Sequence, residues 1–483
     1  YEIGVRLVGS EMCIRDSTHI DVAWLWRTKH TREKAVRSFS TALRMMDRYE
    51  EFTFLQTQPQ LYQYIKQDQP ALYEKIKEKI KDGRWEPDGG MWVEADCNIP
   101  SGESLVRQFL YGIRFMEQEF GKKCGYLWLP DVFGYSWALP QILKQCRIET
   151  FMTTKISWNQ FNTIPDDVFW WRGIDGSEIL TYFVNTPEAG RELDTRYSTY
   201  SGMMDPRTAA GSWKKFRNKD LSKNTLISYG YGDGGGGVTR DMLEMRRAMD
   251  RLPGLPWVKP VKAGEFFQNL HEDMENSDEY VHTWDGELYL EYHRGTYTSQ
   301  AYNKKTNRHM EQELARTEWL ASVSFAKGGG YPHQVIDACW REVLLLQFHD
   351  IIPGSSIGEV YQDSKISYGM AEKAADGVKK EAFENLMRAG ENCFGIYTVN
   401  SFSGKELVQV PVSQAGYFAD AGGTELEAQR TDAGYEVLVD LQPFSMQNIT
   451  FVPGDFVPVE QVVLEQKSVF KTGTNCIQTP FYI

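Results

Sequence analysis

The sequence predicts an α/β protein that continues into a helical segment and then into a β-rich segment. Over residues 1–286, short apolar stretches alternate with longer stretches in which apolar residues recur every three to four positions. Such alternation is typical of a mostly parallel sheet, either open or closed into a barrel. Strand patterns become scarce from about Glu287 and return as short alternating segments from about Cys393. We therefore expect an α/β domain at 1–286, a helical domain at 287–388 and the start of an all-β domain at 389–483.

The expected strands of the first domain are short, and most of them precede a helical pattern. We expect strands at 52–55, 126–131, 151–154, 179–183, 226–229 and from 85 onward, and helices at 31–50, 61–81, 101–120, 240–252 and from 139 onward. Parallel sheets gather their functional groups at the carboxyl ends of the strands. Asp131 and the glycine-rich loop 229–237 both follow expected strands, so both are candidates for such a site.

The second domain shows three helical patterns, at 301–322, 332–348 and 366–387, which predict a three-helix bundle. The third shows short alternating strands at 397–399, 407–410 and 435–439. This pattern is still under way at Ile483, so we expect a C-terminal part to be missing from the chain.

The first 17 residues fit the rest of the chain poorly. A short strand is expected at 4–9, but Glu11, Arg15 and Asp16 place charges where a buried strand should lead into His19. The chain also does not begin with Met, so we expect its true start to be missing or processed. These observations raise the hypothesis that residues 1–17 are not native and that the first strand is impaired.

Composition excludes several classes of partner. The formal net charge is -13, and an acidic chain repels nucleic acids and anionic membranes. The seven Cys show no zinc-binding spacing, which indicates free thiols in a reducing compartment. No apolar run reaches the ~18 residues of a membrane span, and the start lacks the apolar core of a signal peptide. We expect a cytoplasmic protein with no membrane partner, for which a homo-oligomer remains open.

The stretch from His19 to Trp26 is the first candidate for chemistry. His19 and Asp21 stand two residues apart, so on an extended segment both side chains leave the same face. Imidazole and carboxylate together form half of a site for a divalent metal. Trp24 and Trp26 follow, and aromatic side chains beside a polar group suit a sugar ring. The simpler alternative is a hydrogen-bonded His–Asp pair without metal.

Two further motifs supply matching side chains. Asp131 stands at a strand end before a glycine turn, where it could merely cap that turn. His349 and Asp350 close a helix before Pro353, where a His is also favoured by the helix C-terminus. Together the motifs offer only nitrogen and oxygen ligands. Such a set fits zinc or a similar ion, with a position left for substrate, and fits calcium less well.

The glycine-rich loop contains a G-x-G-x-x-G pattern from Gly230 to Gly235, with Asp250 twenty residues beyond Gly230. This spacing is typical of a dinucleotide site, but Asp233 would then face the pyrophosphate. A flexible loop is a second alternative. The third, which we favour, is a loop that holds Asp233 beside a ligand as a general acid/base.

Glycoside cleavage needs two carboxylates, one that attacks and one that supplies a proton. Asp131 near a cation would stay ionised and suit attack, while Asp233 could carry the proton.

The four motifs HID-x-x-W, LPD-x-F-G, GDGGGG and FHD-x-IPG-S occur in this order over 18–359. In identity and order they resemble glycoside hydrolase family 38, the retaining α-mannosidases, and look closest to its cytosolic and bacterial branch. Residues 102–108, 154–160 and 292–297 support the resemblance.

The resemblance implies a barrel-like (β/α)7 catalytic domain, a three-helix bundle and then β domains that can reach the sugar site. It implies an exo-acting hydrolase of terminal α-D-mannosides that binds Zn²⁺, or Co²⁺ in some members. The implied metal ligands are His19, Asp21, Asp131 and His349. Asp131 would also be the nucleophile and Asp233 the acid/base, while Trp24, Phe133 and Asp350 would bind the sugar.

Three alternatives make different predictions. A metal-dependent carbohydrate deacetylase or amidohydrolase would use Asp131 as ligand or base and never as a covalent nucleophile. A non-catalytic, metal-dependent sugar-binding protein would bind a ligand without turnover. A nucleotide-dependent oxidoreductase would bind NAD at the glycine-rich loop.

Overall fold

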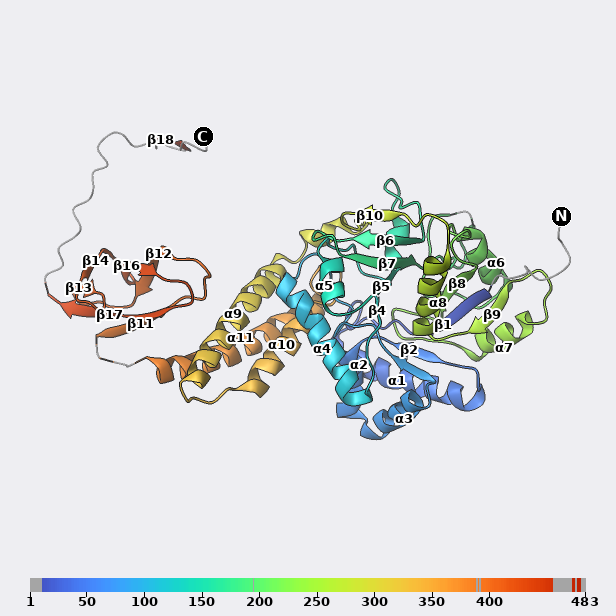
Figure 1. Cartoon of the computed structure of the whole chain (residues 1–483). Helices are drawn as coiled ribbons and strands as arrows, with labels where there is room; N and C mark the ends of the chain where they lie inside the picture. The colour runs from blue at the N-terminus through green and yellow to red at the C-terminus, as the bar shows by residue number, and fades with distance from the viewer. Residues whose placement is uncertain are drawn as a thin grey trace. The chain divides into compact units, whose positions relative to one another are not determined.

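The structure is a computed structural model, and it describes residues 11–193, 195–387, 390, 392–454, 471–473 and 476–478. The described residues form two compact units. The first contains the chain up to Leu314 together with Gln334–Ala374, and the second contains Ala315–His333 and the chain from Ala375 onward. Figure 1 labels the helices and strands of both units along the chain.

The first sheet of unit 1 is entirely parallel. Its strand order is β3-β2-β1-β8, and β9 also pairs with β1. The strands are β1 (Glu11–Ser17), β2 (Phe54–Gln56), β3 (Trp85–Pro87), β8 (Asn224–Tyr229) and β9 (Trp257–Pro260).

The second sheet of unit 1 has the order β10-β6-β7-β5-β4, and only its β6–β7 pair is antiparallel. Its strands are β4 (Tyr126–Trp128), β5 (Thr150–Thr153), β6 (Val168–Arg172), β7 (Glu178–Phe183) and β10 (Thr283–Asp285). Beyond the named strands, Gly89 near the end of β3 forms one parallel bridge with Leu127 of β4. The mostly parallel α/β class is therefore confirmed, whereas a closed (β/α)7 barrel is not.

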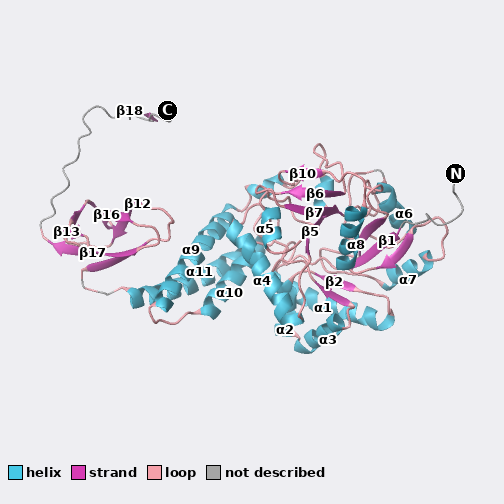
Figure 2. Cartoon of the chain, in the orientation of Figure 1, coloured by secondary structure: helices cyan, strands magenta, loops and turns pink. Residues whose placement is uncertain are grey.

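Helices connect these strands (Figure 2). They are α1 (Thr28–Arg48), α2 (Pro59–Asp68), α3 (Pro70–Lys81), α4 (Gly102–Phe120), α5 (Leu139–Gln145), α6 (Pro206–Lys215), α7 (Arg240–Met249) and α8 (Ala263–Asn276), with 3₁₀ turns η1 (Lys155–Trp158) and η2 (Arg294–Tyr297). The single helix expected at 61–81 is wrong. Gln69 leaves the helical conformation, because Pro70 lacks an amide hydrogen and restricts the residue before it.

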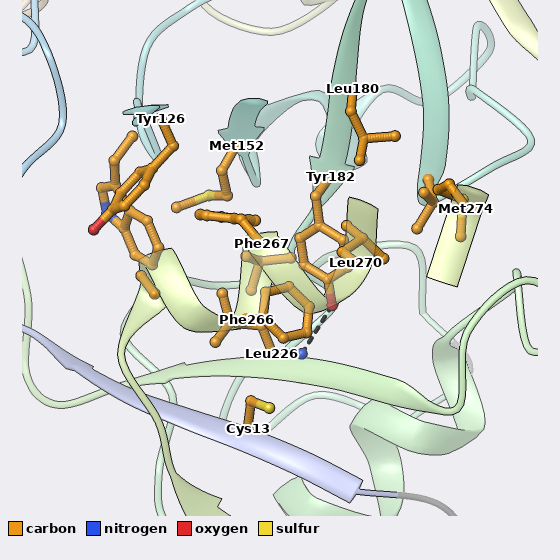
Figure 3. Packing of buried hydrophobic residues seen from close by; sticks show 14 of the residues in the cluster. Cys13, Tyr126, Met152, Leu180, Tyr182, Leu226, Phe266, Phe267, Leu270 and Met274 are labelled. Carbon is orange, nitrogen blue, oxygen red and sulfur yellow. Dashed lines mark hydrogen bonds between the residues drawn. The ribbon is translucent and has the colours of Figure 1, made fainter. Parts of the chain in front are cut away.

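Helix α8 packs against both sheets in one core. Phe266, Phe267 and Leu270 of α8 lie in the same buried cluster as Cys13 of β1 and Tyr182 of β7 (Figure 3). The backbone amide of Leu226 on β8 donates a hydrogen bond of 2.9 Å to the Tyr182 hydroxyl. Burial of each such large side chain contributes about 1.5–3 kcal/mol, so this core holds the two sheets together.

The stretch with unexpected charges forms β1. It pairs in parallel with β2, β8 and β9, and Met12, Cys13 and Ile14 are buried. The expected impairment of the first strand is therefore not observed. The strand expected at 4–9 lies outside the described residues, and the non-native origin of 1–17 stays a hypothesis.

The three helices expected after the α/β domain are present as α9 (Ala301–Ala326), α10 (His333–Leu346) and α11 (Gly358–Leu386). The division between the two units runs through α9 and α11, so the domain boundaries drawn from the sequence stay predictions. Within the part of the chain that the structure describes, no helix combines the length and apolar character that a membrane crossing requires.

The β-rich region of unit 2 contains a four-stranded sheet in the order β11-β17-β13-β14 and a three-stranded sheet in the order β12-β16-β15. A buried cluster that includes Phe418, Tyr435 and Phe451 lies within this region. Its strands are β11 (Cys393–Tyr397), β12 (Gly404–Val410), β13 (Gly416–Ala419), β14 (Glu425–Leu426), β15 (Ala428–Thr431), β16 (Gly434–Leu441) and β17 (Met446–Pro453), followed by the paired β18 (Lys471–Gly473) and β19 (Cys476–Gln478).

Candidate active site

Four side chains from distant parts of the sequence converge in unit 1. His19 and Asp21 follow β1, Asp131 follows β4, and His349 follows α10. All four side chains are buried. Each offers one nitrogen or oxygen atom that could bind a metal, and these four atoms lie within 4.8 Å of one another. His19 Nε2 lies 2.8 Å from Asp21 Oδ1. The cluster is thus the set of ligands expected from the sequence.

The environment of His349 fits a metal ligand. Its Nδ1 lies 2.7 Å from the main-chain oxygen of Glu94, which can only accept, so Nδ1 carries the proton. Its buried Nε2 has no hydrogen-bond partner among the residues that the structure describes, and it lies 3.7 Å from both Asp21 Oδ1 and Asp131 Oδ2. That distance is too long for a hydrogen bond. It is close to the ~3.4 Å between donors that share a tetrahedral ion at 2.0–2.2 Å.

Glu94 orients the second histidine as well. Its Oε2 lies 3.0 Å from His19 Nδ1, and its Oε1 accepts a 2.9 Å hydrogen bond from the Thr57 hydroxyl. Both imidazoles therefore have Nδ1 engaged by Glu94, which leaves Nε2 facing the carboxylates. Histidines that bind metals are held in this way by a carboxylate or a carbonyl. The residues present therefore fit a divalent cation.

The charges around the cluster keep Asp131 ionised. Burial alone would raise the pKa of Asp131, but the Lys155 ammonium, which forms an ion pair with it, and His349 hold that pKa well below its usual range. Although burial disfavours the imidazolium, Asp131 and Asp350 raise the pKa of His349 to about 9. Burial, followed by the neighbouring Asp21, raises the pKa of Asp350 to about 7. The cluster thus has an excess of carboxylates that a cation would neutralise.

A cavity of about 450 Å³ opens beside the cluster. Six residues expected from the sequence line it, namely Asp21, Trp24, Asp131, Phe133, Asp233 and Asp350. The Phe133 ring lies 5.7 Å from the His349 ring, and the Ser355 hydroxyl donates to the Asp350 carboxylate. Asp21 and Asp131 therefore line the same cavity as the residues predicted to bind the sugar.

The glycine-rich loop brings Asp233 to this cavity. Gly234 forms an antiparallel bridge with Ile20, and the Asp21 amide donates a 2.9 Å hydrogen bond to the main-chain oxygen of Asp233. Asp233 itself has a positive φ of 49°, a strained conformation that this pairing holds. The Tyr200 hydroxyl donates a 2.7 Å hydrogen bond to Asp233 Oδ1. The loop thus places a carboxylate beside the cluster, as the acid/base interpretation requires.

Comparison with known proteins decides the family. Residues 12–287 match the profile of the glycosyl hydrolases family 38 N-terminal domain, and residues 291–386 match that of the alpha mannosidase middle domain. The chain belongs to glycosyl hydrolase family 38. The β-rich region follows these two matched segments.

Several curated relatives are alpha-mannosidases. Alpha-mannosidase G of Dictyostelium discoideum is 46% identical over 71% of this chain and 30% of its own length. Alpha-mannosidase 2C1 of Homo sapiens is 38% identical over 82% of this chain and 37% of its own length. Alpha-mannosidase of Saccharomyces cerevisiae is 41% identical over 75% of this chain and 33% of its own length. The chain spans about a third of the length of these relatives.

A solved structure shares the fold. The alpha-mannosidase of Enterococcus faecalis V583 superposes with a TM-score of 0.79 at 18% identity, over 96% of this chain and 58% of that one. At 18% identity, this similarity shows only that the two chains share a fold.

Further residues without a predicted role line the same cavity. Lys155, Trp158, Tyr200 and His293 also line the cavity. The stretches 154–160 and 292–297 contribute to the resemblance, but it assigned no role to these side chains. The signal for Lys155 was its position, because it directly follows the strand expected at 151–154, and Trp158 closes the turn that begins with Lys155. Glu94 gave a similar signal, as a carboxylate inside an apolar stretch after β3.

Proposed function

We propose that this chain carries the active site of a retaining exo-α-mannosidase that hydrolyses terminal α-D-mannosides with a bound divalent metal. The observation that carries the proposal is the arrangement of two carboxylates, Asp131 and Asp233, along one cavity beside the four-residue cluster. Paired carboxylates with different environments are the general device of glycoside hydrolysis.

Asp131 is the proposed nucleophile. Its carboxylate attacks the anomeric carbon, the bond to the leaving oxygen breaks, and a mannosyl-aspartate forms. Lys155 and His349 favour the ionised carboxylate that this attack requires. Water then attacks the same carbon and releases mannose, which leaves Asp131 ionised again.

Asp233 is the proposed acid/base. It gives its proton to the leaving oxygen in the first step and takes a proton from the attacking water in the second. The hydrogen bond from Tyr200 fixes the carboxyl group at the cavity wall.

The proposed metal ligands are His19, Asp21, Asp131 and His349, and the proposed ion is Zn²⁺ or Co²⁺. Such an ion supplies positive charge that orients sugar hydroxyls and stabilises negative charge. Trp24 and Phe133 offer rings to the apolar face of the sugar, and Asp350 accepts hydrogen bonds from its hydroxyls.

The proposed location is the cytoplasm, and neither nucleic acid nor membrane is a proposed partner. Free thiols suit a reducing compartment, and the free cysteines among the described residues are Cys13, Cys97, Cys124, Cys146, Cys339 and Cys393. Whether the chain forms a homo-oligomer stays open.

A mechanism-based fluorinated mannosyl label tests this function. Fluorine next to the anomeric carbon withdraws electrons and slows both steps, and an activated leaving group restores the first one, so the label accumulates on the nucleophile. We expect peptide mass spectrometry to find it on Asp131 and not in an Asp131→Asn variant. A folded, metal-loaded chain that stays unlabelled while releasing acetate from an N-acetylated sugar would be a deacetylase. Binding of a mannoside without label or turnover, unchanged by Asp233→Asn, would identify a sugar-binding protein.

A further inference from the structure

A second cavity of about 370 Å³ lies next to the candidate active site. The two cavities share Ser198. Between them runs the turn η1, in which Lys155 and Trp158 line the active-site cavity while Ile156 and Ser157 line the second one. The Trp158 indole nitrogen donates a 3.1 Å hydrogen bond to the main-chain oxygen of Ser198, so the shared wall is braced. None of the residues assigned to hydrolysis lines this second cavity.

Cations dominate its described lining. The basic lining residues are Arg196, Lys214, Lys215 and Arg217, against the single acid Asp167. Asp167 is already paired with Arg217 at 2.6 Å. This excess of positive charge stands in a chain whose formal net charge is -13.

Within the described part of the chain, no carboxylate forms an ion pair with Arg196, Lys214 or Lys215, and Asp167 and Glu188 act on Lys215 only through their charge. Among the described residues, the hydrogen bonds of Lys215 and Arg196 go to neutral oxygens: Lys215 Nζ donates at 2.5 Å to the main-chain oxygen of Tyr197, and Arg196 Nη2 donates at 2.8 Å to the Tyr197 hydroxyl. Burial lowers the pKa of Lys215 to about 8. A negatively charged ligand would restore the stabilisation that the ammonium loses on burial.

Asn185 supplies a second, independent observation. It follows β7, is 4% exposed and lines this cavity. Neither its side-chain oxygen nor its side-chain nitrogen has a hydrogen-bond partner within the described structure. A buried amide without partners destabilises the fold, so such a group requires a ligand or ordered water to satisfy it. Its NH₂ group can donate to an oxygen of a ligand held by the cations.

We propose that this second cavity binds a small oxyanion, a phosphate or carboxylate group, through Arg196, Lys214 and Lys215 with Asn185 as an uncharged donor. The apolar walls formed by Ile164, Phe183 and Val184 suit a carbon skeleton that carries the charged group. The proposed oxyanion site is distinct from the sugar site and does not depend on the hydrolytic function proposed above.

Isothermal titration of the metal-loaded chain with inorganic phosphate, and separately with acetate, tests the oxyanion site at constant chloride concentration. We expect one saturable site for at least one of the two anions. Lys215→Gln and Arg196→Gln should each weaken that binding by about tenfold or more. Lys223→Gln is the matched control, because it removes the same charge from an exposed lysine outside this cavity. Binding of phosphate alone identifies a phosphate site, and binding of acetate as well identifies a site for either group.

Two further points keep the test decisive. Arg196 is exposed, so Arg196→Gln leaves the fold intact even if Lys215→Gln does not. Asn185→Leu, with its metal content checked, should also weaken binding because it removes the uncharged donor. The proposal is overturned if neither anion saturates. It is also overturned if Lys215→Gln, Arg196→Gln and the control Lys223→Gln all weaken binding equally. A third contrary result is binding that neither Lys215→Gln nor Arg196→Gln affects, which is expected for phosphate held at the metal cluster.

Discussion

The carboxylate of Glu94 lies 3.0 Å from Nδ1 of His19, while the main-chain oxygen of the same residue accepts a 2.7 Å hydrogen bond from Nδ1 of His349. One buried residue therefore contacts Nδ1 of both imidazoles, and its main-chain oxygen places the proton of His349 on that nitrogen. The two contacts differ in kind, because only the one to His19 depends on the side chain. This difference allows the role of Glu94 to be tested without disturbing His349.

Glu94→Gln should lower the affinity for zinc. The amide keeps the size of the side chain but loses the negative charge that polarises His19, and losses of such supporting contacts typically cost 10–100-fold in metal affinity. Competition with a chromophoric chelator measures the dissociation constant. Glu117→Gln, at an exposed position on α4, is the control and should leave it unchanged. An unaltered affinity in Glu94→Gln would show that the contact with His19 does not hold the metal ligand.

Purified chain should contain about one zinc or cobalt ion, and His349→Ala should lose it. The variant removes one of four proposed ligands and leaves Asp21 and Asp131 close together without a partner on that side. Elemental analysis gives the metal content, and chelation should lower the melting temperature of the wild-type chain because the ion binds only the folded state. His309→Ala removes an exposed histidine paired with Glu372 and should keep the metal. Folded wild-type protein without metal would contradict the proposed site.

Asp233→Asn should separate the two roles of the carboxylates. Loss of a general acid typically lowers rates by about 10²–10⁴, and the loss should be greatest for substrates whose leaving oxygen needs a proton. A dinitrophenyl mannoside needs no such proton, so its first step should be largely retained and the mannosyl-enzyme should accumulate. Rapid-quench kinetics compare the first step for the dinitrophenyl mannoside with that for a mannoside whose leaving oxygen needs a proton. Asp241→Asn, at an exposed position on α7, is the control, and an equal loss on both substrates would argue against an acid role.

Gly235→Ala should destabilise the chain more than Gly254→Ala. Both glycines have positive φ, 75° and 79°, so an alanine is strained at either by about 1–2 kcal/mol. At Gly235 the added methyl group would also lie 2.7 Å from the Ser38 hydroxyl oxygen and 3.0 Å from an Ile20 carbon, whereas at Gly254 it meets open space. Denaturant unfolding gives the two free energies. Equal losses would show that the loop does not pack tightly on the segment that carries His19 and Asp21.

Much of the architecture could be predicted because it depends on local patterns. Apolar periodicity located β2, β4, β5, β7 and β8, as well as the three helices after the α/β domain. The elements β6, β9, β10, α6 and α8 were not anticipated, although the buried residues of α8 recur every three to four positions. The formation of β1 shows the opposite limit. Its local sequence argues against a buried strand, yet strands on both sides supply backbone partners, and Met12, Cys13 and Ile14 are buried. Tertiary pairing can outweigh local preference in this way.

The sequence by itself determined which kinds of groups are available, namely two histidines and several carboxylates at the ends of strands and helices, and their order identified the family. Only the tertiary structure decided which of them meet. Glu94 and His349 are 255 residues apart, and their contact depends on where β3 and α10 end in the fold. The same holds for Lys155 beside Asp131 and for the oxyanion cavity around Asn185. The physical reason is that side-chain periodicity is a local property, whereas the distance between the ends of two strands follows from how the sheets pair and pack on a common core.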